Sequence, residues 1–278
     1  MSAMRVLVLG ASGYLGGVIT RRLAAAGFEV WGTCRSAAGT GRLLPLDAAD
    51  PDAPDALLDR LAPQGVVSCL RGPFEAQLRC HGRLAAYACR APEVRVVYLS
   101  SANVFDGELT RPHTEAEPPC PKSDYGRFKA ECEALLCRSL GPQCAVLRLP
   151  QVWGPASPRF CELRRAVAAG APVDAAENLF LNAALDVQVA CITESLLRAG
   201  GQGIYHVGTR TACGQAEFLR MVCARAGLAA PALRVERLPE NEYFAVLPGR
   251  GDAPPAAGLE LQELLVAFEA PGKAAPMR

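Results

Sequence analysis

A tyrosine and a lysine stand four positions apart in the segment SDYGRFKAE, residues 123–131. On a helix this spacing places Tyr125 and Lys129 on one face, with the ammonium group near the phenol. A phenol ordinarily has a pKa near ~10, and a fixed cation close by makes it a better acid or base at neutral pH. Such pairs are frequent in helices by chance, so the chemistry needs support from elsewhere in the chain.

A serine supplies that support. Ser101 lies in VVYLSSANVFDG (96–107), where an apolar strand runs into a loop. Ligands of open α/β sheets bind outside the carboxyl ends of the strands. A hydroxyl at this place could hydrogen-bond a substrate carbonyl oxygen while Tyr125 supplies the proton. Together Ser101, Tyr125 and Lys129 predict a proton-transfer site.

The segment VLVLGASGYLGG places Gly10, Gly13 and Gly16 between an apolar strand and an amphipathic helix. In such a turn the first glycine permits the tight bend, the second lets the backbone approach a pyrophosphate, and the third lets helix and strand pack closely. The diphosphate would then lie at the helix N-terminus. We expect a dinucleotide site here; the alternative is a purely structural turn.

Two residues further along bear on the choice of dinucleotide. Arg35, after the second strand, offers a fork of donors suited to a 2′-phosphate, where an acidic residue would bind ribose hydroxyls. NADP(H) is therefore favoured, with NAD(H) as the alternative. Asp47, in LLPLDAAD, could accept a hydrogen bond from the adenine amino group or serve as a turn or helix cap.

The elements that must position these residues follow from the hydrophobic pattern, which alternates short β-branched runs with helix-compatible runs. We expect strands at Arg5 to Leu9, Glu29 to Thr33, Leu43 to Leu46, Gly65 to Leu70, Val94 to Leu99 and Ala145 to Leu149, and helices near 14–26, 54–62, 75–90 and 125–139. The intervals are long enough for parallel crossovers, so the fold class is α/β, a Rossmann-type doubly wound parallel sheet.

Beyond residue 155 the rhythm changes, and the 278-residue chain is short for two independent domains. We expect residues 1–155 to form the NAD(P)-binding domain and residues 156–278 a smaller substrate-binding lobe interleaved with it. The lobe would hold helices near 159–169, 186–199 and 214–226, a strand at 203–208, an irregular path over 229–258, a last helix at 259–268 and a frayed end.

Composition excludes several classes of protein. A formal net charge of +1 gives no general attraction to nucleic acid or to an anionic membrane. The apolar run before Gly10 is too short for a signal peptide, and none approaches the length of a bilayer span. The 12 cysteines form no C-x-x-C pair or zinc pattern, so we expect no metal and a reducing, cytoplasmic compartment. His81, His113 and His206 are expected to be surface or packing residues.

With these motifs in place, the chain resembles the extended short-chain dehydrogenase/reductase superfamily, and within it the dTDP-4-dehydrorhamnose reductase family, also called the sugar-nucleotide-binding reductases. The resemblance spans roughly residues 4–226, through GASGYLG, SSANVFDG, HTEAEPPCPKSDYGRFKAECEALL, LRLPQVWGP and GIYHVG. It implies that Tyr125 and Lys129 are the catalytic pair, with Ser101 where the family has Thr or Ser. It also implies reduction of a 4-keto group on a nucleotide-linked sugar by NAD(P)H, with Tyr125 as proton donor and Lys129 lowering its pKa and holding the nicotinamide ribose.

The chain departs from this family at the substrate. Ala102 and Asn103 replace an Asp and a Tyr, and SCLRGPFEAQ (68–77) replaces an A-A-Y-T-like stretch, which places Arg71 beside the expected cleft. Arg71 could hold a diphosphate or a carboxylate, or be a solvated loop charge. The expected cofactor-binding set is Gly10, Ser12, Gly13, Tyr14, Leu15, Gly16, Arg35, Asp47, Leu70, Arg71, Tyr125 and Lys129. The expected substrate contacts are Arg71, Asn103, Val104, Phe105 and Trp153, although core packing is an alternative use of Trp153 and Phe160.

Two other functions stay open at this stage. One is an epimerase or dehydratase of the same fold, in which the nicotinamide is recycled; Ala102 and Asn103 speak against it, because such enzymes often carry an acidic residue there. The other is a non-catalytic dinucleotide-binding subunit that regulates a partner enzyme, a role known among relatives of the family. A homodimer is compatible with either.

Overall fold

The computed structural model describes residues 3–35, 41–50 and 52–269. Its centre is a seven-stranded sheet in the order β11-β6-β5-β4-β1-β2-β3, with every neighbouring pair parallel. The strands are β1 (Arg5–Leu9), β2 (Glu29–Cys34), β3 (Leu43–Pro45), β4 (Gly65–Ser68), β5 (Arg95–Ser101), β6 (Cys144–Leu149) and β11 (Gly203–His206). The expected doubly wound α/β sheet is confirmed.

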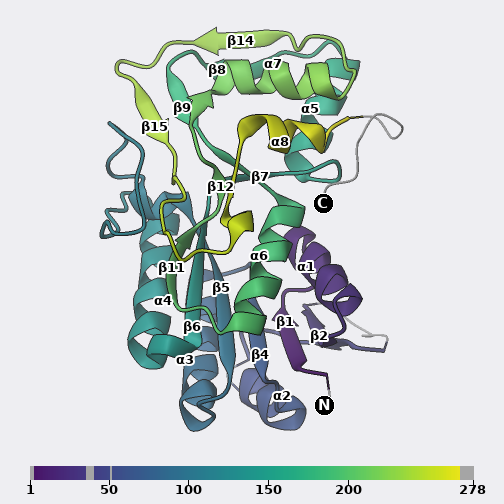
Figure 1. Cartoon of the computed structure of the whole chain (residues 1–278), viewed down its shortest axis with the longest axis vertical. Helices are drawn as coiled ribbons and strands as arrows, with labels where there is room; N and C mark the ends of the chain where they lie inside the picture. The colour runs from purple at the N-terminus through teal and green to yellow at the C-terminus, as the bar shows by residue number, and fades with distance from the viewer. Residues whose placement is uncertain (1–2, 36–40, 51, 270–278) are drawn as a thin grey trace.

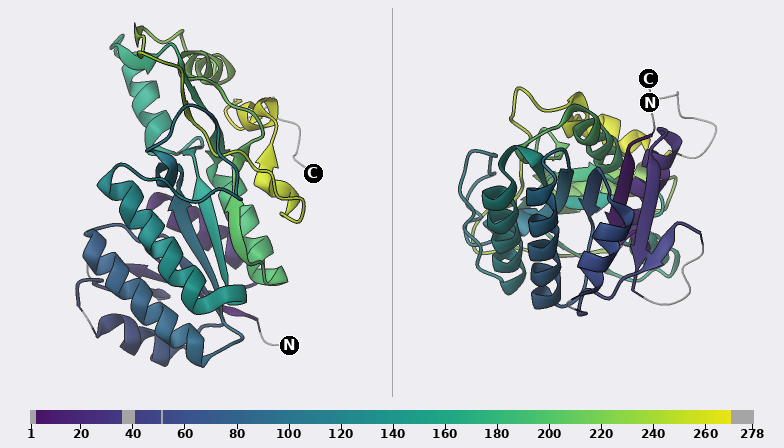
Figure 2. Two further views of the ribbon diagram at one scale, coloured as in Figure 1. Left: turned by 90° about the vertical axis from the view of Figure 1, so that its left-hand side faces the viewer. Right: turned by 90° about the horizontal axis from the view of Figure 1, so that it is seen from below.

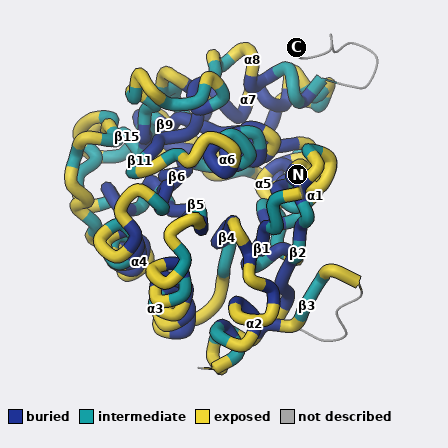
Figure 3. The backbone as a smooth tube through the Cα atoms, turned by 60° about the horizontal axis from the view of Figure 1, so that its bottom comes forward, coloured by how far each residue is buried: buried dark blue, intermediate teal, exposed yellow. Residues whose placement is uncertain are grey.

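Helices cover both faces of this sheet, as the views in Figure 2 show. They are α1 (Tyr14–Ala25), α2 (Ala53–Leu61), α3 (Phe74–Arg90), α4 (Asp124–Leu140) and α6 (Asp186–Ala199). Alternate residues of β1 point to opposite faces: Val6 and Val8 pack in one core with α1 and α6, and Leu7 and Leu9 in another with α2, α3 and α4. Burial on both faces explains why the inner strands β1, β4, β5 and β6 are nearly continuous apolar runs, and Figure 3 shows the centre of the sheet as buried.

A smaller lobe lies above the sheet in Figure 1 and has its own hydrophobic core. Its helices are α5 (Pro158–Ala168), α7 (Gln215–Arg225) and α8 (Leu261–Val266). Its short strands pair as β8 (Val173–Ala176) with β14 (Leu233–Glu236), and as β9 (Leu179–Leu181) with β13 (Cys213–Gly214) and β15 (Glu242–Phe244). The pairs β7 (Gln151–Trp153) with β10 (Ala183–Leu185), and β12 (Gly208–Thr209) with β16 (Gly258–Leu259), complete the described strands.

Two expectations about the second half of the chain were wrong. The helix at 186–199 and the strand at 203–208 were assigned to the lobe, but α6 packs against α1 and β11 extends the main sheet by pairing with β6. The path over 229–258 was expected to be irregular, yet it contributes β14 and β15 to the lobe. Helix α8 lies inside the expected range 259–268. The expected fraying concerns residues 270–278, which lie outside the described residues, and the division near residue 155 stays a proposal.

Several aromatic and imidazole side chains belong to the packing. Trp153 and Phe160 lie in the core of the lobe, and the Trp153 ring meets Phe218 edge-on at 5.1 Å between centroids. His81, His113 and His206 are all buried, which confirms them as packing residues. Within residues 3–35, 41–50 and 52–269, none of the helices has the length and apolar character that crossing a membrane requires.

Candidate active site

The turn between β1 and α1 has the geometry that its glycines predict. Gly10 has φ +79°, and a Cβ there would lie 2.7 Å from the carbonyl oxygen of Cys69. A Cβ on Gly16 would strike the Gly10 carbonyl, so helix and turn touch backbone to backbone. Helix α1 begins after Gly13 with no side chain capping it. Its first amide groups are thus left to bind an anion.

Two adjoining cavities follow the carboxyl ends of the strands. One, of about 330 Å³, is lined by Gly10, Ser12, Thr33, Arg35 and Asp47. The other, of about 470 Å³, is lined by Tyr14, Leu15, Phe74, Tyr125 and Lys129. Both are bordered by the same residues at their junction, which are Gly13, Cys69, Leu70, Arg71, Gly72 and Gln77. The arrangement suits an elongated ligand that crosses the glycine turn, with one end in each cavity.

The residues expected to select the dinucleotide both lie at the smaller cavity. Arg35 and Asp47 are exposed there, after β2 and β3. Asp47 Oδ1 accepts a hydrogen bond of 2.9 Å from the Ala49 amide, which is the turn-capping alternative. The contact of Arg35 with a 2′-phosphate remains a prediction, and so does the contact of Asp47 with adenine.

Tyr125 is brought to Ser101 by the way α4 begins. Ser123 caps the helix by accepting a hydrogen bond of 3.0 Å from the Gly126 amide. A Cβ at Gly126 would strike the Asn103 carbonyl oxygen, so the helix start packs against the backbone of the 3-10 turn Ala102–Phe105. Ser101 Oγ donates to Asn103 Oδ1 at 2.9 Å. The proton-donor candidate and the serine therefore meet although 24 positions separate them.

The electrostatics of Tyr125 differ from the sequence expectation. Burial raises the pKa of its phenol, while the hydrogen bond to Ser101 and the positive charge of Arg71 lower it in part. Lys129 is not among the groups that shift the pKa of Tyr125; its Nζ lies 5.8 Å from the centroid of the tyrosine ring. The sequence assigned the lowering of the Tyr125 pKa to Lys129, but in the structure Ser101 and Arg71 lower it. The Lys129 ammonium group instead donates to the Leu99 carbonyl oxygen.

Lys129 lies beneath the larger cavity and is only 7% exposed. Its Nζ donates a hydrogen bond of 2.9 Å to the Leu99 carbonyl oxygen. Burial lowers the pKa of Lys129 to about 8, and the neighbouring Cys132, Cys69 and Glu133 oppose that change. The group is thus mostly cationic at neutral pH, with further donors available to a ribose.

Arg71 is exposed and lines both cavities at their junction. Its charge also acts on the pKa values of Tyr125 and Lys129, lowering each of them. The position fits either of the anionic groups considered for it, a cofactor diphosphate or a charged group of the substrate.

Three of the expected substrate contacts are corrected by the structure. Val104 and Phe105 are completely buried, and Trp153 is 3% exposed, inside the lobe core. Their hydrophobicity serves packing, so we do not carry them forward as substrate contacts. Asn103 instead holds Ser101, through its side-chain oxygen and through its amide, which donates to Ser101 Oγ at 3.2 Å.

Sequence reasoning missed several residues of the larger cavity, Phe74 and Gln77 among them. Phe74 is 41% exposed at the start of α3, stacks on Phe128 at 4.6 Å between centroids, and lies 6.1 Å from the Tyr125 ring. Gln77 Nε2 donates to the Gly72 carbonyl oxygen at 2.8 Å and thereby holds the Arg71 turn. The signal available for Phe74 was an aromatic residue directly after a Gly-Pro turn, which alone is weak.

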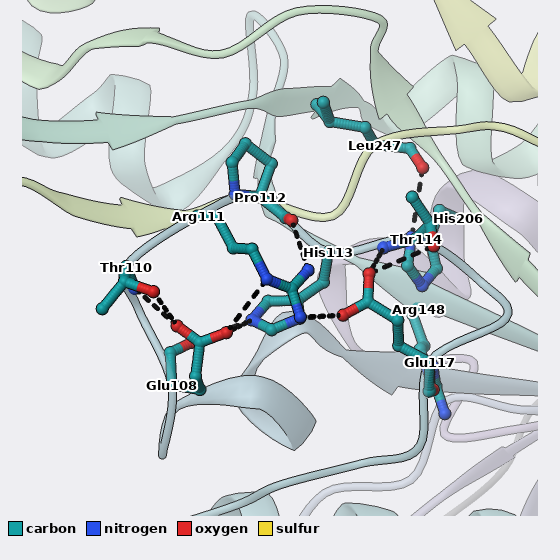
Figure 4. Close-up of polar contacts among 10 residues, drawn as sticks. All are labelled: Glu108, Thr110, Arg111, Pro112, His113, Thr114, Glu117, Arg148, His206 and Leu247. Carbon is teal, nitrogen blue, oxygen red and sulfur yellow. Dashed lines mark hydrogen bonds and ion pairs between the residues drawn. The ribbon is translucent and has the colours of Figure 1, made fainter.

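The loop that leads into α4 is held by its own polar network (Figure 4). Arg111 pairs with Glu117 at 2.7 Å, and the His113 ring hydrogen-bonds Glu117 at 2.9 Å and the Glu108 carbonyl oxygen at 2.8 Å. At its far end, Asp106 Oδ1 accepts from the Ser123 amide at 3.1 Å. The network fixes the approach to α4 and, through it, the position of Tyr125.

Known proteins resemble this chain in sequence. Residues 73–270 match the family model described as RmlD substrate binding domain. The protein named "Probable low-salt glycan biosynthesis reductase Agl14" from Haloferax volcanii is 29% identical over 79% of each chain. The dTDP-4-keto-6-deoxy-D-glucose reductase of Streptomyces niveus is 28% identical over 73% of this chain and 72% of that one.

Solved structures share the fold. The dTDP-4-dehydrorhamnose reductase of Yersinia enterocolitica superposes with a TM-score of 0.76 at 17% identity, covering 95% of this chain and 99% of that one. The UDP-glucose 4-epimerase of Thermus thermophilus, crystallised with NAD, gives 0.75 at 22% identity over 95% and 99%. The glycine turn, the Ser101–Tyr125–Lys129 cluster and the family match over most of the chain lead to one conclusion: the protein belongs to the RmlD substrate binding domain family, on the extended short-chain dehydrogenase/reductase fold.

Proposed function

We propose that the protein is an NAD(P)H-dependent reductase that acts on a keto group of a nucleotide-linked sugar. The observation that carries the proposal is the contact of Ser101 with Tyr125, which together with Lys129 lines a cavity that continues past the glycine turn. A dinucleotide with its diphosphate at the start of α1 has room for its nicotinamide end beside Tyr125.

Each residue has one task in this reaction. The reduced nicotinamide supplies the hydride to the ketone carbon when it is bound. Ser101, held by Asn103, orients the carbonyl oxygen, and the Tyr125 hydroxyl gives its proton to that oxygen as negative charge develops. Lys129 is cationic and lies at the floor of the larger cavity, where it binds the ribose next to the nicotinamide. Arg71 makes the field at Tyr125 more positive and so stabilises its deprotonated form after transfer.

For the cofactor we propose NADP(H) ahead of NAD(H). The exposed guanidinium of Arg35 stands at the smaller cavity where the adenosine ribose would lie, and no acidic side chain occupies that strand end. A guanidinium binds a phosphate through paired, charge-assisted hydrogen bonds. The Bacillus anthracis dTDP-4-dehydrorhamnose reductase, which superposes with a TM-score of 0.75 at 16% identity, was crystallised with NADP.

For the substrate we propose a nucleotide diphosphate sugar that carries a ketone. The Streptomyces niveus relative is named as a reductase of a dTDP-linked keto sugar, and Arg71 offers a permanent cation at the mouth of the larger cavity for an anionic group of such a ligand. The buried Val104, Phe105 and Trp153 leave Arg71, Asn103 and the exposed Phe74 as the side chains closest to the sugar.

The experiment is a turnover assay with a panel of dTDP- and UDP-linked keto sugars, following NADPH consumption. A reductase consumes one NADPH for each sugar reduced, whereas an epimerase or dehydratase leaves NADPH unchanged and a regulatory subunit turns over no sugar. Tyr125→Phe should lower turnover by about 10²–10⁴-fold while leaving NADPH affinity nearly intact, because the substitution removes only the hydroxyl group that donates the proton. Equal activity of this variant would remove Tyr125 from the mechanism.

A further inference from the structure

The ammonium group of Lys129 is buried without a carboxylate partner. Its Nζ donates to the Leu99 carbonyl oxygen, and no described Asp or Glu lies within ion-pair distance of it. The carboxylate on the next turn of the same helix, Glu133, is bonded to Arg148 through contacts of 2.8 and 3.1 Å and also accepts from Ser100. A buried cation needs compensation in the fold, and here Glu133 raises the pKa of Lys129 without pairing with it directly.

Among the aromatic rings around the Lys129 ammonium group, the Tyr98 ring is the nearest. Nζ lies 4.8 Å from the centroid of the Tyr98 ring, nearer than to Phe128 at 5.7 Å or Tyr125 at 5.8 Å. A cation over a ring face at this distance is attracted by the ring quadrupole, and more strongly when water is excluded. Tyr98 is 1% exposed and Lys129 is 7% exposed, so the contact is largely shielded from water.

The Tyr98 hydroxyl does not explain why an aromatic residue stands here. It lies beside the Cys132 thiol, a weak partner, and makes no conventional hydrogen bond among the described residues. A buried hydroxyl without a good partner costs free energy. The useful part of the side chain is its ring face.

A second layer holds that ring in place. The His81 ring meets Tyr98 edge-on, with 5.0 Å between centroids and an interplanar angle of 78°. His81 is itself held by Ser68 Oγ at 2.7 Å and by Cys132 Sγ at 3.4 Å. Burial lowers the pKa of His81 to about 3, so the imidazole is neutral and adds no charge against Lys129. Four elements, β4, α3, β5 and α4, contribute one residue each to this layer.

We propose that Tyr98, fixed by His81, is a positioning residue whose ring face keeps Lys129 cationic and directed at the larger cavity. The titratable and charged groups that surround Lys129 are Cys69, Arg71, His81, Tyr98, Tyr125, Cys132 and Glu133. Because burial already brings the pKa of Lys129 down to about 8, a further decrease of roughly one unit on loss of the ring face makes a large part of the amine neutral at physiological pH. The role of the cation in ribose binding rests on the proposed function; its charge state does not.

The test measures the protonation of Lys129 directly. The sequence contains three lysines, at positions 122, 129 and 273, so a protein with Lys122→Arg and Lys273→Arg carries one lysine. Labelled with ¹³C at Cε and titrated by NMR without cofactor or substrate, it reports the pKa of Lys129 alone. The variants to compare are Tyr98→Phe, then Tyr98→difluorophenylalanine and Tyr98→trifluorophenylalanine, which keep the ring shape and weaken its quadrupole.

Tyr98→Phe should leave the titration of Lys129 nearly unchanged, because the ring face stays. The fluorinated rings should lower its midpoint stepwise, by roughly one pH unit for the most fluorinated ring. The same fluorinated residue at Phe160, in the lobe core, is the matched control and should have no effect. A titration that is indifferent to fluorination at Tyr98 overturns the proposal, and unchanged thermal unfolding excludes misfolding as the cause of any shift.

The outcomes separate this inference from the proposed function. A pKa that follows fluorination in a protein that reduces no keto sugar supports the Tyr98 role and removes the reductase assignment. A reductase whose Lys129 ignores fluorination removes the Tyr98 role alone. In an active enzyme the affinity for NADPH should weaken above the Lys129 midpoint, at a lower pH in the fluorinated variants than in Tyr98→Phe.

Discussion

The two cavities along the sheet edge hold their polar groups in different ways. In the larger one, Lys129 is buried and packed over Tyr98, so the core fixes its position. Beside that cavity, the hydrogen bond to Asn103 holds Ser101. In the smaller one, Arg35 and Asp47 stand exposed at strand ends. Catalytic groups tolerate little displacement from the reacting atoms. An exposed charged residue that selects the cofactor can be substituted without disturbing the core.

The largest expected effect concerns the turn that joins the cavities. Gly13→Val should lower the affinity for the dinucleotide by about 100-fold or more, because the side chain would occupy the place of the diphosphate at the helix start. Isothermal titration with NADPH measures it. The control is Gly82→Ala, since a Cβ at Gly82 in α3 meets no heavy atom within 4 Å. Unchanged affinity of Gly13→Val would mean that the dinucleotide does not cross this turn.

The next effect concerns the buried Lys129 at the larger cavity and is measured as a change in protein stability. Lys129→Met should raise the free energy of unfolding at pH 7 by about 3 kcal/mol at most, because the pKa of Lys129 is about 8 in the folded protein and 10.5 ordinarily. The lost hydrogen bond to Leu99 offsets part of this gain.

The pH dependence of that difference has a definite sign. The penalty on the wild-type lysine is complete below pH 8 and is relieved as pH rises from 8 towards 10.5. The advantage of Lys129→Met should therefore shrink over this window. Urea unfolding at several pH values measures it, and a constant difference from pH 7 to pH 10 would contradict the buried-cation picture.

A smaller effect is expected at the exposed cavity. Arg35→Ala should weaken NADPH by about 10- to 100-fold and NADH hardly at all, since the charge-assisted bonds to the 2′-phosphate are lost. Its control is Arg79→Ala, an exposed arginine of α3 that pairs with Glu75 and borders neither cavity. An equal loss for both dinucleotides would place Arg35 away from the 2′ position.

The smallest effect lies at the junction of the cavities. Arg71 lowers the pKa values of both Tyr125 and Lys129, so Arg71→Gln should raise both. Reduction requires each group protonated, and the alkaline limb of the kcat/KM profile should therefore move to higher pH, by less than about one unit. Arg79→Gln should leave the profile in place; a shift to lower pH in Arg71→Gln would refute the assigned field.

Much of the architecture could be predicted from local pattern. The strand Arg5–Leu9 and the helix bounds near 14–26 and 75–90 follow from apolar periods of two and 3.6 residues. The placement of α6 and β11 could not be predicted in this way. Their residues predict a helix and a strand, but not whether these belong to the main sheet or to the lobe. Pairing of Ile204 with Val146 decided it, across a separation that local pattern does not reach.

The candidate site divides in the same way. Residue type and order predicted that Ser101, Tyr125 and Lys129 would act together, since their strand-end and helix positions are local properties. The same reasoning wrongly placed Val104, Phe105 and Trp153 at the substrate. The type of an apolar residue does not show whether it lines a cavity or packs in the core. Burial depends on what the rest of the chain packs against the residue.

The sequence by itself determined the α/β alternation, the glycine turn and the Tyr125–Lys129 spacing, because each depends on neighbours within one or two turns of chain. Only the tertiary structure decided that Lys129 lies over Tyr98 and that Arg71 and Ser101, and not Lys129, lower the pKa of Tyr125. Interactions between charges depend on distance and on the exclusion of water. Both quantities are set by strands and helices that come from separate parts of the chain.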